Sequence, residues 1–245
     1  MEKKIIWFKY FFLKAIVNSK VIVPVSFFMK KKFLNCLNEY QLKSIENKVK
    51  VLYAGMFKGG FKKDSYLNNN INIKGEVYFS CGRIIKEKGY DDIALTLSKL
   101  PKYFEYTWII AGIGSYLDEF KKLCTELDII NNIIFLNNVP RQELKFWYEK
   151  SDCFILLSRL KESFSLVHLE SQFFGIPAIG MNHSGMREAI KNNSTGFLLN
   201  DYSELYNILI NKEYLKLDKN EIKEFSEKFD TCHQVNILLK YLIDK

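Results

Sequence analysis

The sequence lacks the patterns that mark several protein classes. Its five cysteines are odd in number and no two have CxxC spacing, which argues against a disulfide framework and against a cysteine-rich metal site. No repeat is present, and the one low-complexity stretch is Asn68-Asn69-Asn70. No Asp-x-Asp pair occurs that could hold a divalent cation. We therefore expect a cytoplasmic protein with reduced thiols and no metal cofactor.

A membrane-spanning segment is also missing from the pattern. A transmembrane helix needs about 20 mostly apolar residues, and Lys9 and Lys14 interrupt the aromatic N-terminal run before that length is reached. We interpret this run as a packed helix of a globular domain. A signal peptide and a basic helix lying on a membrane surface remain alternatives, the second implying peripheral contact with the inner face of the plasma membrane.

What is present indicates a folded chain with a basic surface. The 245 residues are 48% hydrophobic and 26% charged, which is typical of a globular protein with a sizeable core. The formal net charge of +8 suits an anionic partner such as nucleic acid, phospholipid or a phosphorylated substrate. The lysines are scattered and form no cluster with stacking aromatics, so we expect no nucleic acid partner.

Short apolar segments alternate with helical patterns from Val77 onward. This alternation predicts a parallel sheet with helices on both faces, an α/β Rossmann-like fold. The predicted strands are 77–80, 106–111, 133–136, 153–157, 178–181 and 196–199, and the predicted helices are 90–100, 116–127, 142–150, 165–174 and 186–191. Before them we expect a helix at 2–18, a strand at 21–26, a helix at 27–37, a polar connection at 36–50 and a strand at 51–54; residues after 199 are expected to be helical.

The loops after these strands hold the residues that carry chemistry, because ligands of such sheets bind at the carboxyl ends of the strands. The first loop contains Gly82-Arg83 and Lys88, and the loop after 153–157 contains Glu162 and opens the helix that holds Glu170. In isolation, Glu170 reads as an exposed helix residue and Glu162 as a partner of the helix dipole.

In this order the motifs resemble those of the retaining glycosyltransferases of family 4, the glycosyl transferases group 1. Their GR…EKG opening, VGxG turn, FLG-x-V segment, E-x7-E motif, GxPVI, GGxxE loop and xTGxL strand are matched by Gly82–Gly89, Ala111–Gly114, Phe135–Pro140, Glu162–Glu170, Gly175–Ile179, Ser184–Glu188 and Ser194–Leu198. Each short motif is weak alone, but the ordered set over half the chain is specific. The resemblance implies that this stretch is the C-terminal, donor-binding half of a GT-B fold.

The resemblance also implies roles for the named residues. Arg83 and Lys88 would stabilise the charge that grows on the leaving diphosphate, Glu162 would lie near the transferred sugar, and Glu170 would accept from the ribose. The free N–H groups of the loop that opens the helix would bind the anion in place of a metal; the remaining binding residues we expect are Gly82, Val139, Ser163, Phe164, Ser165 and Leu166. Val139 is expected near the base.

Ser163, Ser165 and Ser184 stand where that family usually has glycine. Serine adds a Cβ where the backbone would approach phosphate, although its hydroxyl could donate to phosphate instead.

The chain is short for such an enzyme, which has two Rossmann-like domains. We expect 1–50 to be a remnant of the acceptor domain with its linker, 51–220 to bind the donor, and 221–245 to be a helix that packs back toward the N-terminal part. The predicted function is a retaining transferase that moves a sugar from UDP- or GDP-sugar to a glycan or lipid-linked acceptor in envelope polysaccharide synthesis. A split enzyme that needs a separate acceptor-domain chain, a truncated product and a donor-binding module without transfer activity remain alternatives.

Overall fold

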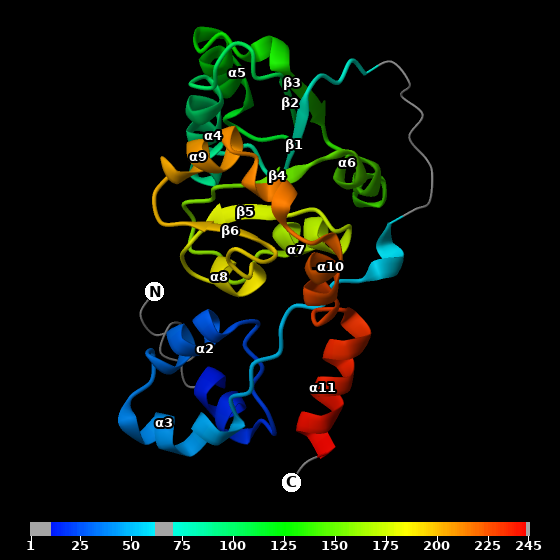
Figure 1. The fold of residues 1–245 in the computed structure, drawn as a ribbon. Helices are drawn as coiled ribbons and strands as arrows, with labels where there is room; N and C mark the ends of the chain where they lie inside the picture. Colours follow the sequence, from blue (N-terminus) through cyan, green and yellow to red (C-terminus); the bar gives the residue numbers. More distant parts are fainter. Residues whose placement is uncertain (1–10, 62–70, 244–245) are drawn as a thin grey trace.

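The computed structural model describes residues 11–61 and 71–243. Its centre is a six-stranded parallel sheet with the order β3-β2-β1-β4-β5-β6 (Figure 1). The strands are β1 (Glu76–Cys81), β2 (Tyr106–Ala111), β3 (Ile133–Asn137), β4 (Cys153–Ile155), β5 (Ala178–Met181) and β6 (Gly196–Leu199). The predicted Rossmann-like α/β fold is therefore confirmed, although β4 ends two residues earlier than expected.

Continuous apolar runs form these strands because both faces of the sheet are covered. All six residues of β2 are buried, and so are the middle four of β1. The buried Ser80 satisfies its polar atoms within the sheet, donating to the Ile155 carbonyl oxygen at 2.5 Å and accepting from the Trp108 indole N–H at 2.9 Å. One hydroxyl thereby links the three central strands without an unpaired polar group.

Helices connect the strands and cover both faces of the sheet. One face carries α4 packed against α5 and α9, and the other carries α7 packed against α10 (Figure 1). The helices of this part are α4 (Tyr90–Leu97), α5 (Leu117–Glu126), α6 (Leu144–Lys150), α7 (Leu166–Phe173), α8 (Met186–Ala189), α9 (Glu204–Ile210), α10 (Lys219–Glu227) and α11 (Thr231–Ile243). Short 3-10 turns lie at Lys58–Gly60, Lys86–Lys88, Ile130–Asn132, Arg141–Glu143 and Glu213–Lys216.

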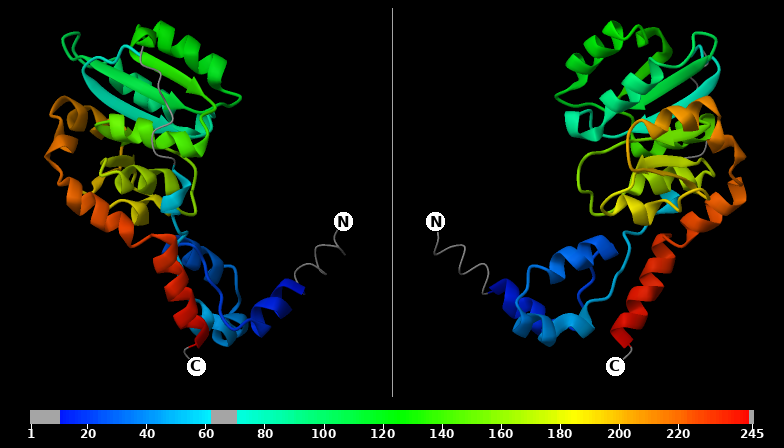
Figure 2. Two further views of the ribbon diagram at one scale, coloured as in Figure 1. Left: turned by 90° about the vertical axis from the view of Figure 1, so that its right-hand side faces the viewer. Right: turned by 60° about the vertical axis from the view of Figure 1, so that its left-hand side comes forward.

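The C-terminal helix differs from the single helix expected at 221–245. It is two helices, α10 and α11, and residues 228–230 between them pair with the segment before the sheet: Met56 N–H donates to the Phe229 carbonyl oxygen at 2.8 Å. α11 then runs beside the N-terminal residues (Figure 2). The Tyr241 hydroxyl donates to the Val51 carbonyl oxygen at 3.1 Å, and Lys20 donates to the Leu242 carbonyl oxygen.

The N-terminal part is where the strand predictions are wrong. Residues 22–24 and 48–52 do run side by side, and Lys50 N–H donates to the Ile22 carbonyl oxygen at 3.0 Å. However, they form a single bridge between Ile22 and Val49, and neither 21–26 nor 51–54 is a strand. Pro24 has no N–H to donate, so the ladder cannot continue through it.

The polar connection expected at 36–50 is also wrong, because it contains the helix α3 (Glu39–Ile45) and a 3-10 turn (Glu46–Lys48). A capping box starts α3: the Asn38 side chain accepts from Gln41 N–H at 2.9 Å, and the Gln41 side chain accepts from Asn38 N–H at 3.1 Å. The helix expected at 27–37 is shorter, α2 (Phe27–Leu34). Residues 11–18 are helical as expected, and residues 2–10 of that prediction lie outside the described residues.

Within the described ranges, no helix is both long and apolar enough to cross a membrane.

Candidate functional site

The strand order reverses between β1 and β4: β2 and β3 follow on one side of β1, and β5 and β6 follow on the far side of β4. The loops after β1 and β4 meet at this point. In open α/β sheets this switch point is where ligands bind. The loops are packed backbone to backbone. A Cβ on Gly112 would lie 1.9 Å from the Gly82 carbonyl oxygen, and one on Gly185 would lie 2.1 Å from the Ser163 carbonyl oxygen. Glycine at these two positions allows the loops to approach each other this closely.

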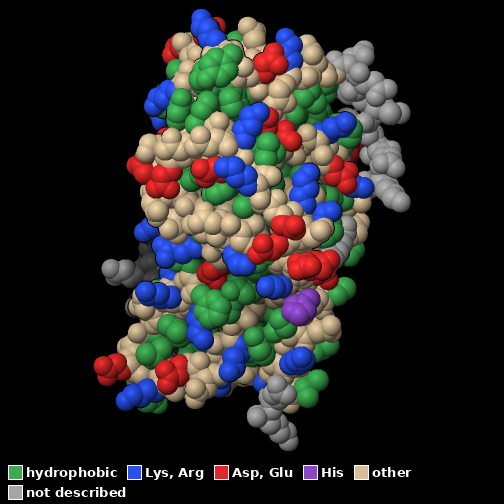
Figure 3. All heavy atoms as spheres, in the orientation of Figure 1, with side chains coloured by type: hydrophobic (Ala, Val, Ile, Leu, Met, Phe, Trp, Pro, Cys, Tyr) green, Lys and Arg blue, Asp and Glu red, His purple; other side chains and the backbone are tan. Residues whose placement is uncertain are grey.

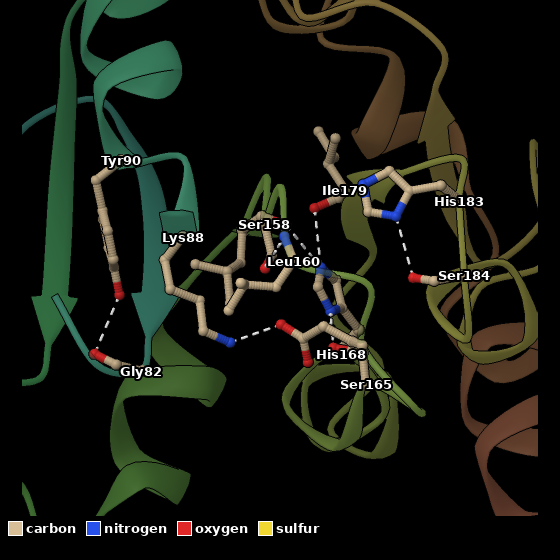
Figure 4. Close-up of polar contacts among 12 residues, drawn as sticks. Gly82, Lys88, Tyr90, Ser158, Leu160, Ser165, His168, Ile179, His183 and Ser184 are labelled. Carbon is tan, nitrogen blue, oxygen red and sulfur yellow. Dashed lines mark hydrogen bonds and ion pairs between the residues drawn. The ribbon is translucent and has the colours of Figure 1, made fainter. Parts of the chain in front are cut away.

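Lys88 and Glu162 form an ion pair across the switch point. Lys88 Nζ lies 2.6 Å from Glu162 Oε1, reaching from the loop after β1 toward the loop after β4 (Figure 4). Burial, the largest single effect, acts to raise the pKa of Glu162, but the Lys88 ammonium and the Ser158 hydroxyl together hold that pKa below its usual value. The site therefore contains an ionised carboxylate beside an ammonium group, both mostly shielded from water.

His168 forms a buried polar centre behind this pair, between Ser165 and Ile179 (Figure 4). His168 Nε2 lies 3.2 Å from both the Leu156 and Ile179 carbonyl oxygens, so Nε2 carries the proton and donates. His168 Nδ1 is then the acceptor of the Ser165 hydroxyl at 2.7 Å. Burial lowers the pKa of His168 to about 4, so the ring is neutral at pH 7.

The hydrogen bond between Ser165 and His168 leaves the N-terminus of α7 without a side-chain cap. Ser165 is the N-cap residue, but its hydroxyl bonds to His168 and does not cap the helix. The first N–H groups of α7 thus have no side-chain partner at the cap, and they carry the partial positive charge of the helix N-terminus. Ser163 before them is exposed, whereas Leu166 is partly buried.

The ring of Phe164 points elsewhere. It packs against Tyr53 and Phe229 with ring centroids 5.2 and 5.5 Å apart, in the cluster between the sheet and the N-terminal part. Any contact of Phe164 with a ligand at the switch point must therefore come from its backbone.

Glu170 lies one turn into α7 and is buried with two partners. Arg141 Nη2 is 2.7 Å from Glu170 Oε1, and the Tyr148 hydroxyl donates to Oε2 at 3.1 Å. Burial raises the pKa of Glu170, against the opposing effects of Arg141 and Tyr148. Sequence reasoning missed both partners; Arg141, directly after the FLG-x-V-like segment, was the available signal.

Arg83 and Val139 line one small cavity at the ends of the first three strands. Its volume is about 180 Å³, and Gly82, Gly112 and Ile113 are among the other residues that line it. Arg83 is exposed and forms no ion pair with any described residue. The loops bring Gly82, Arg83 and Val139 together as the sequence suggests.

Hydrogen bonds also join the loops of the site to the N-terminal part. The Glu188 carboxylate accepts from Phe27 N–H and Phe28 N–H, each at 2.8 Å, and so closes the N-terminus of α2. The Ser26 hydroxyl donates to the Ser163 carbonyl oxygen at 2.6 Å. Burial and the nearby charge of Glu188 raise the pKa of Tyr53 to about 12.

No cluster of three or more metal-ligating side chains occurs among the residues that the structure describes. The groups at this edge of the sheet with the charge or polarity to bind an anion are the cationic side chains and N–H groups described above.

A family model of the glycosyl transferases group 1 matches residues 63–228, which include every loop of the site. The chain belongs to this family. An uncharacterized 41.2 kDa protein of the cps region of Klebsiella pneumoniae is 31% identical over 193 residues, covering 77% of this chain and 50% of that protein. The chain spans about half the length of this and other curated relatives that it matches.

Two further relatives carry specific names. A GDP-mannose-dependent phosphatidylinositol monomannoside mannosyltransferase of Mycobacterium tuberculosis is 26% identical over 128 residues, which are 49% of this chain and 33% of that enzyme. The structure of Anabaena HepE in complex with UDP superposes with a TM-score of 0.75 at 19% identity, covering 93% of this chain and 65% of that one. At this identity, the superposition establishes a shared fold.

Proposed function

We propose that this group 1 chain is the donor-binding part of a retaining glycosyltransferase, which transfers a sugar from UDP- or GDP-sugar to a glycan or lipid-linked acceptor in envelope polysaccharide synthesis. The observation that carries the proposal is the meeting of Arg83, the Lys88–Glu162 pair and the uncapped start of α7 at one switch point. Lys88 and Glu162 already hold each other in place, and the N–H groups at the start of α7 are positioned by the helix.

Their chemistry suits the departure of a nucleoside diphosphate. As the bond between sugar and phosphate breaks, negative charge develops on the leaving diphosphate, and preorganised cations and N–H dipoles stabilise that charge. Arg83 offers a planar fork for two phosphate oxygens and Lys88 a point charge. The N–H groups from Ser163 to Leu166 supply the dipole.

The two glutamates divide the rest of the donor. Glu162 stays ionised beside Lys88 and can accept from sugar hydroxyls. Glu170 already accepts from Arg141 and Tyr148, and each of its oxygens keeps a second lone pair for a ribose hydroxyl. In this arrangement the base lies in the cavity lined by Val139 and Gly82.

The relatives support the donor and the setting. The mycobacterial relative is named for GDP-mannose, the Anabaena structure holds UDP, and the Klebsiella relative lies in a cps region. The sequence resemblance to retaining enzymes of family 4 supports retention of configuration at the anomeric carbon. We place the reaction at the cytoplasmic face of the envelope membrane.

A second candidate is a nucleotide-sugar-binding module that completes an enzyme with a separate acceptor-domain chain. Radiolabelled UDP-glucose and GDP-mannose offered to the purified chain with membrane extract separate the two candidates. Transfer by this chain alone, with the product anomer identified by NMR, supports the transferase; transfer only after a partner chain is added supports the module, and an inverted product contradicts the retaining proposal.

A further inference from the structure

A second cavity lies between α2 and the loops after β4 and β5. Its volume is about 680 Å³, within the range of about 300–1,000 Å³ that small-molecule sites occupy. One wall is a single face of α2, because Phe27, Lys31 and Asn35 follow each other at intervals of four residues. The other wall comes from Lys161, just before Glu162, and from α8.

The lining is strongly cationic. Lys31, Lys32, Lys161 and Arg187 face the cavity, and none of the four forms an ion pair within residues 11–61 and 71–243. Arg187 donates to the Asn182 carbonyl oxygen, which leaves its charge uncompensated. Like charges gathered around one cavity repel each other and raise the positive potential inside it.

The single carboxylate in the lining, Glu188, lowers the net charge of the lining from +4 to +3 but forms no ion pair with the four cations. Both oxygens of Glu188 accept from the N–H groups at the start of α2. The cavity therefore keeps four cations available to an incoming anion. The exposed ring of Phe27 adds an apolar surface at its edge.

This cavity is separate from the proposed donor pocket but shares a loop with it. None of its lining residues lines the Arg83 cavity. Gly185 N–H donates to the Glu162 carbonyl oxygen at 2.9 Å, and Ser26 donates to the Ser163 carbonyl oxygen, so both of its walls are bonded to the backbone that presents Glu162. A ligand held here lies next to the loop that faces the transferred sugar.

We propose that this cavity binds the phosphate or diphosphate of a phosphorylated acceptor. The inference rests on the proposed function, since it names the chemical class of that reaction's acceptor. Lysine ammonium groups and an arginine fork match phosphate oxygens, and four positive charges suit a diphosphate better than a single carboxylate. Phe27 then contacts the group that the phosphate carries.

Calorimetric titration with inorganic pyrophosphate tests this site in the full chain. The variant Lys31→Ser with Lys32→Ser removes two cations from an exposed helix face. We expect it to weaken pyrophosphate binding by about tenfold, as loss of two charge-assisted contacts predicts. The matched control is Lys43→Ser with Lys50→Ser, which removes the same charge from exposed positions outside the cavity and is expected to change affinity by less than about twofold.

The two proposals fail in different ways. If the Lys31/Lys32 variant binds pyrophosphate as well as the control does, this inference is wrong, even when UDP or GDP still binds and the proposed function stands. If Arg83→Ala alone removes all pyrophosphate binding, the cavity is not an anion site. Loss of affinity in the Lys31/Lys32 variant with unchanged nucleotide binding supports the separate acceptor site.

Two phosphorylated probes identify the source of the ligand. Geranyl diphosphate represents a lipid-linked acceptor, and glucose 1-phosphate represents a soluble sugar phosphate. Tighter binding of geranyl diphosphate that Phe27→Ser weakens assigns the site to a lipid-linked acceptor. Equal dependence of both probes on Lys31 and Lys32, without an effect of Phe27→Ser, assigns it to soluble phosphates, and no dependence of either probe on these lysines contradicts the proposal.

Discussion

The titratable side chains in the site keep their charge states because each of them forms an ion pair or a hydrogen bond. Glu162 is paired with Lys88, and Glu170 is held by Arg141 and Tyr148. An unpaired buried carboxylate would instead take up a proton. His168 is the opposite case: two carbonyl oxygens fix its proton on Nε2, and burial keeps the ring neutral. These partners fix the protonation states that the proposed donor site requires.

His168 makes stability depend on pH. Its pKa falls from 6.5 to about 4 on folding, so the unfolded chain binds the proton more readily. The stabilising contribution is complete above pH 6.5 and is lost as the pH falls through about 4. Between pH 7 and pH 5 we expect a loss of about 2 kcal/mol in the free energy of unfolding, measured by urea titration.

The variant His168→Leu checks the origin of this slope. It lacks the titrating group, so its stability should change less between pH 7 and pH 5 even if its absolute stability is lower. His233, which lies outside the site, provides the control substitution His233→Leu, and that variant should keep the wild-type slope. An unchanged slope in His168→Leu contradicts the assignment.

At the scale of elements, the site depends on loops that touch through their backbones. The loop after β5 lies against the loop that opens α7, because Gly185 has no side chain at that contact. The same contact carries the hydrogen bond from Gly185 N–H to Glu162. Displacing one loop therefore displaces Glu162 and the first N–H groups of α7.

Gly185→Ala should disturb both stability and donor binding. Its Cβ would meet the Ser163 carbonyl oxygen at 2.1 Å, and neither backbone can move away freely. We expect a loss of about 1–3 kcal/mol in the free energy of unfolding together with weaker nucleotide binding. Gly60→Ala is the control, since the nearest atom to its Cβ lies 3.6 Å away; equal behaviour of the two variants would contradict this account.

How well each element could be predicted from the sequence differs between the sheet and the N-terminal part. Strands β1, β2, β4 and β5 are almost wholly buried, so their apolar runs reveal them directly. The segments 21–26 and 51–54 are equally apolar, yet the pairing here consists of a few hydrogen bonds between residues 22–24 and 48–52, and Pro24 limits it. Apolar sequence alone does not distinguish a strand from an extended segment covered by helices. The capping box at Asn38 was a readable signal for α3.

For the site, the ordered motifs place Arg83, Lys88 and Glu162 correctly at one edge of the sheet. The environment of Glu170 could not be read from its spacing, because Arg141 and Tyr148 come from the segment after β3. The ring of Phe164 likewise depends on Tyr53 and Phe229, which are distant in sequence. Contacts between remote segments carry no local signal.

On the scale of the whole molecule, the sheet and the N-terminal part are joined by few polar contacts near the site. Glu188 closes α2 and Ser26 donates to Ser163. Farther from the site, α11 runs beside the N-terminal part (Figure 2), with hydrogen bonds to Lys20 and Val51. On the face shown in Figure 3, Lys and Arg side chains are interleaved with Asp and Glu and form no continuous stripe. The net charge is therefore dispersed on this face.

Glu188→Ala should loosen the N-terminal part. Without the carboxylate, the amides of Phe27 and Phe28 lose their acceptor, and the cap of α2 is weakened by about 1 kcal/mol. We expect faster hydrogen exchange at these amides, measured by NMR, while the amides of β2 keep their rates. Glu149→Ala, on the exposed side of α6, is the control; unchanged exchange in Glu188→Ala would show that the link does not hold α2.

We propose that this chain holds a nucleoside diphosphate at the switch point through Arg83 and Lys88. Calorimetric titration with UDP and GDP measures it directly. We predict that UDP or GDP binds the wild-type chain. The double variant Arg83→Ala with Lys88→Ala should weaken this binding by about tenfold or more, because two charged contacts are lost. The control Lys122→Ala, on α5, should have little effect. Binding that the double variant leaves unchanged, or no binding of either nucleotide, would contradict the account.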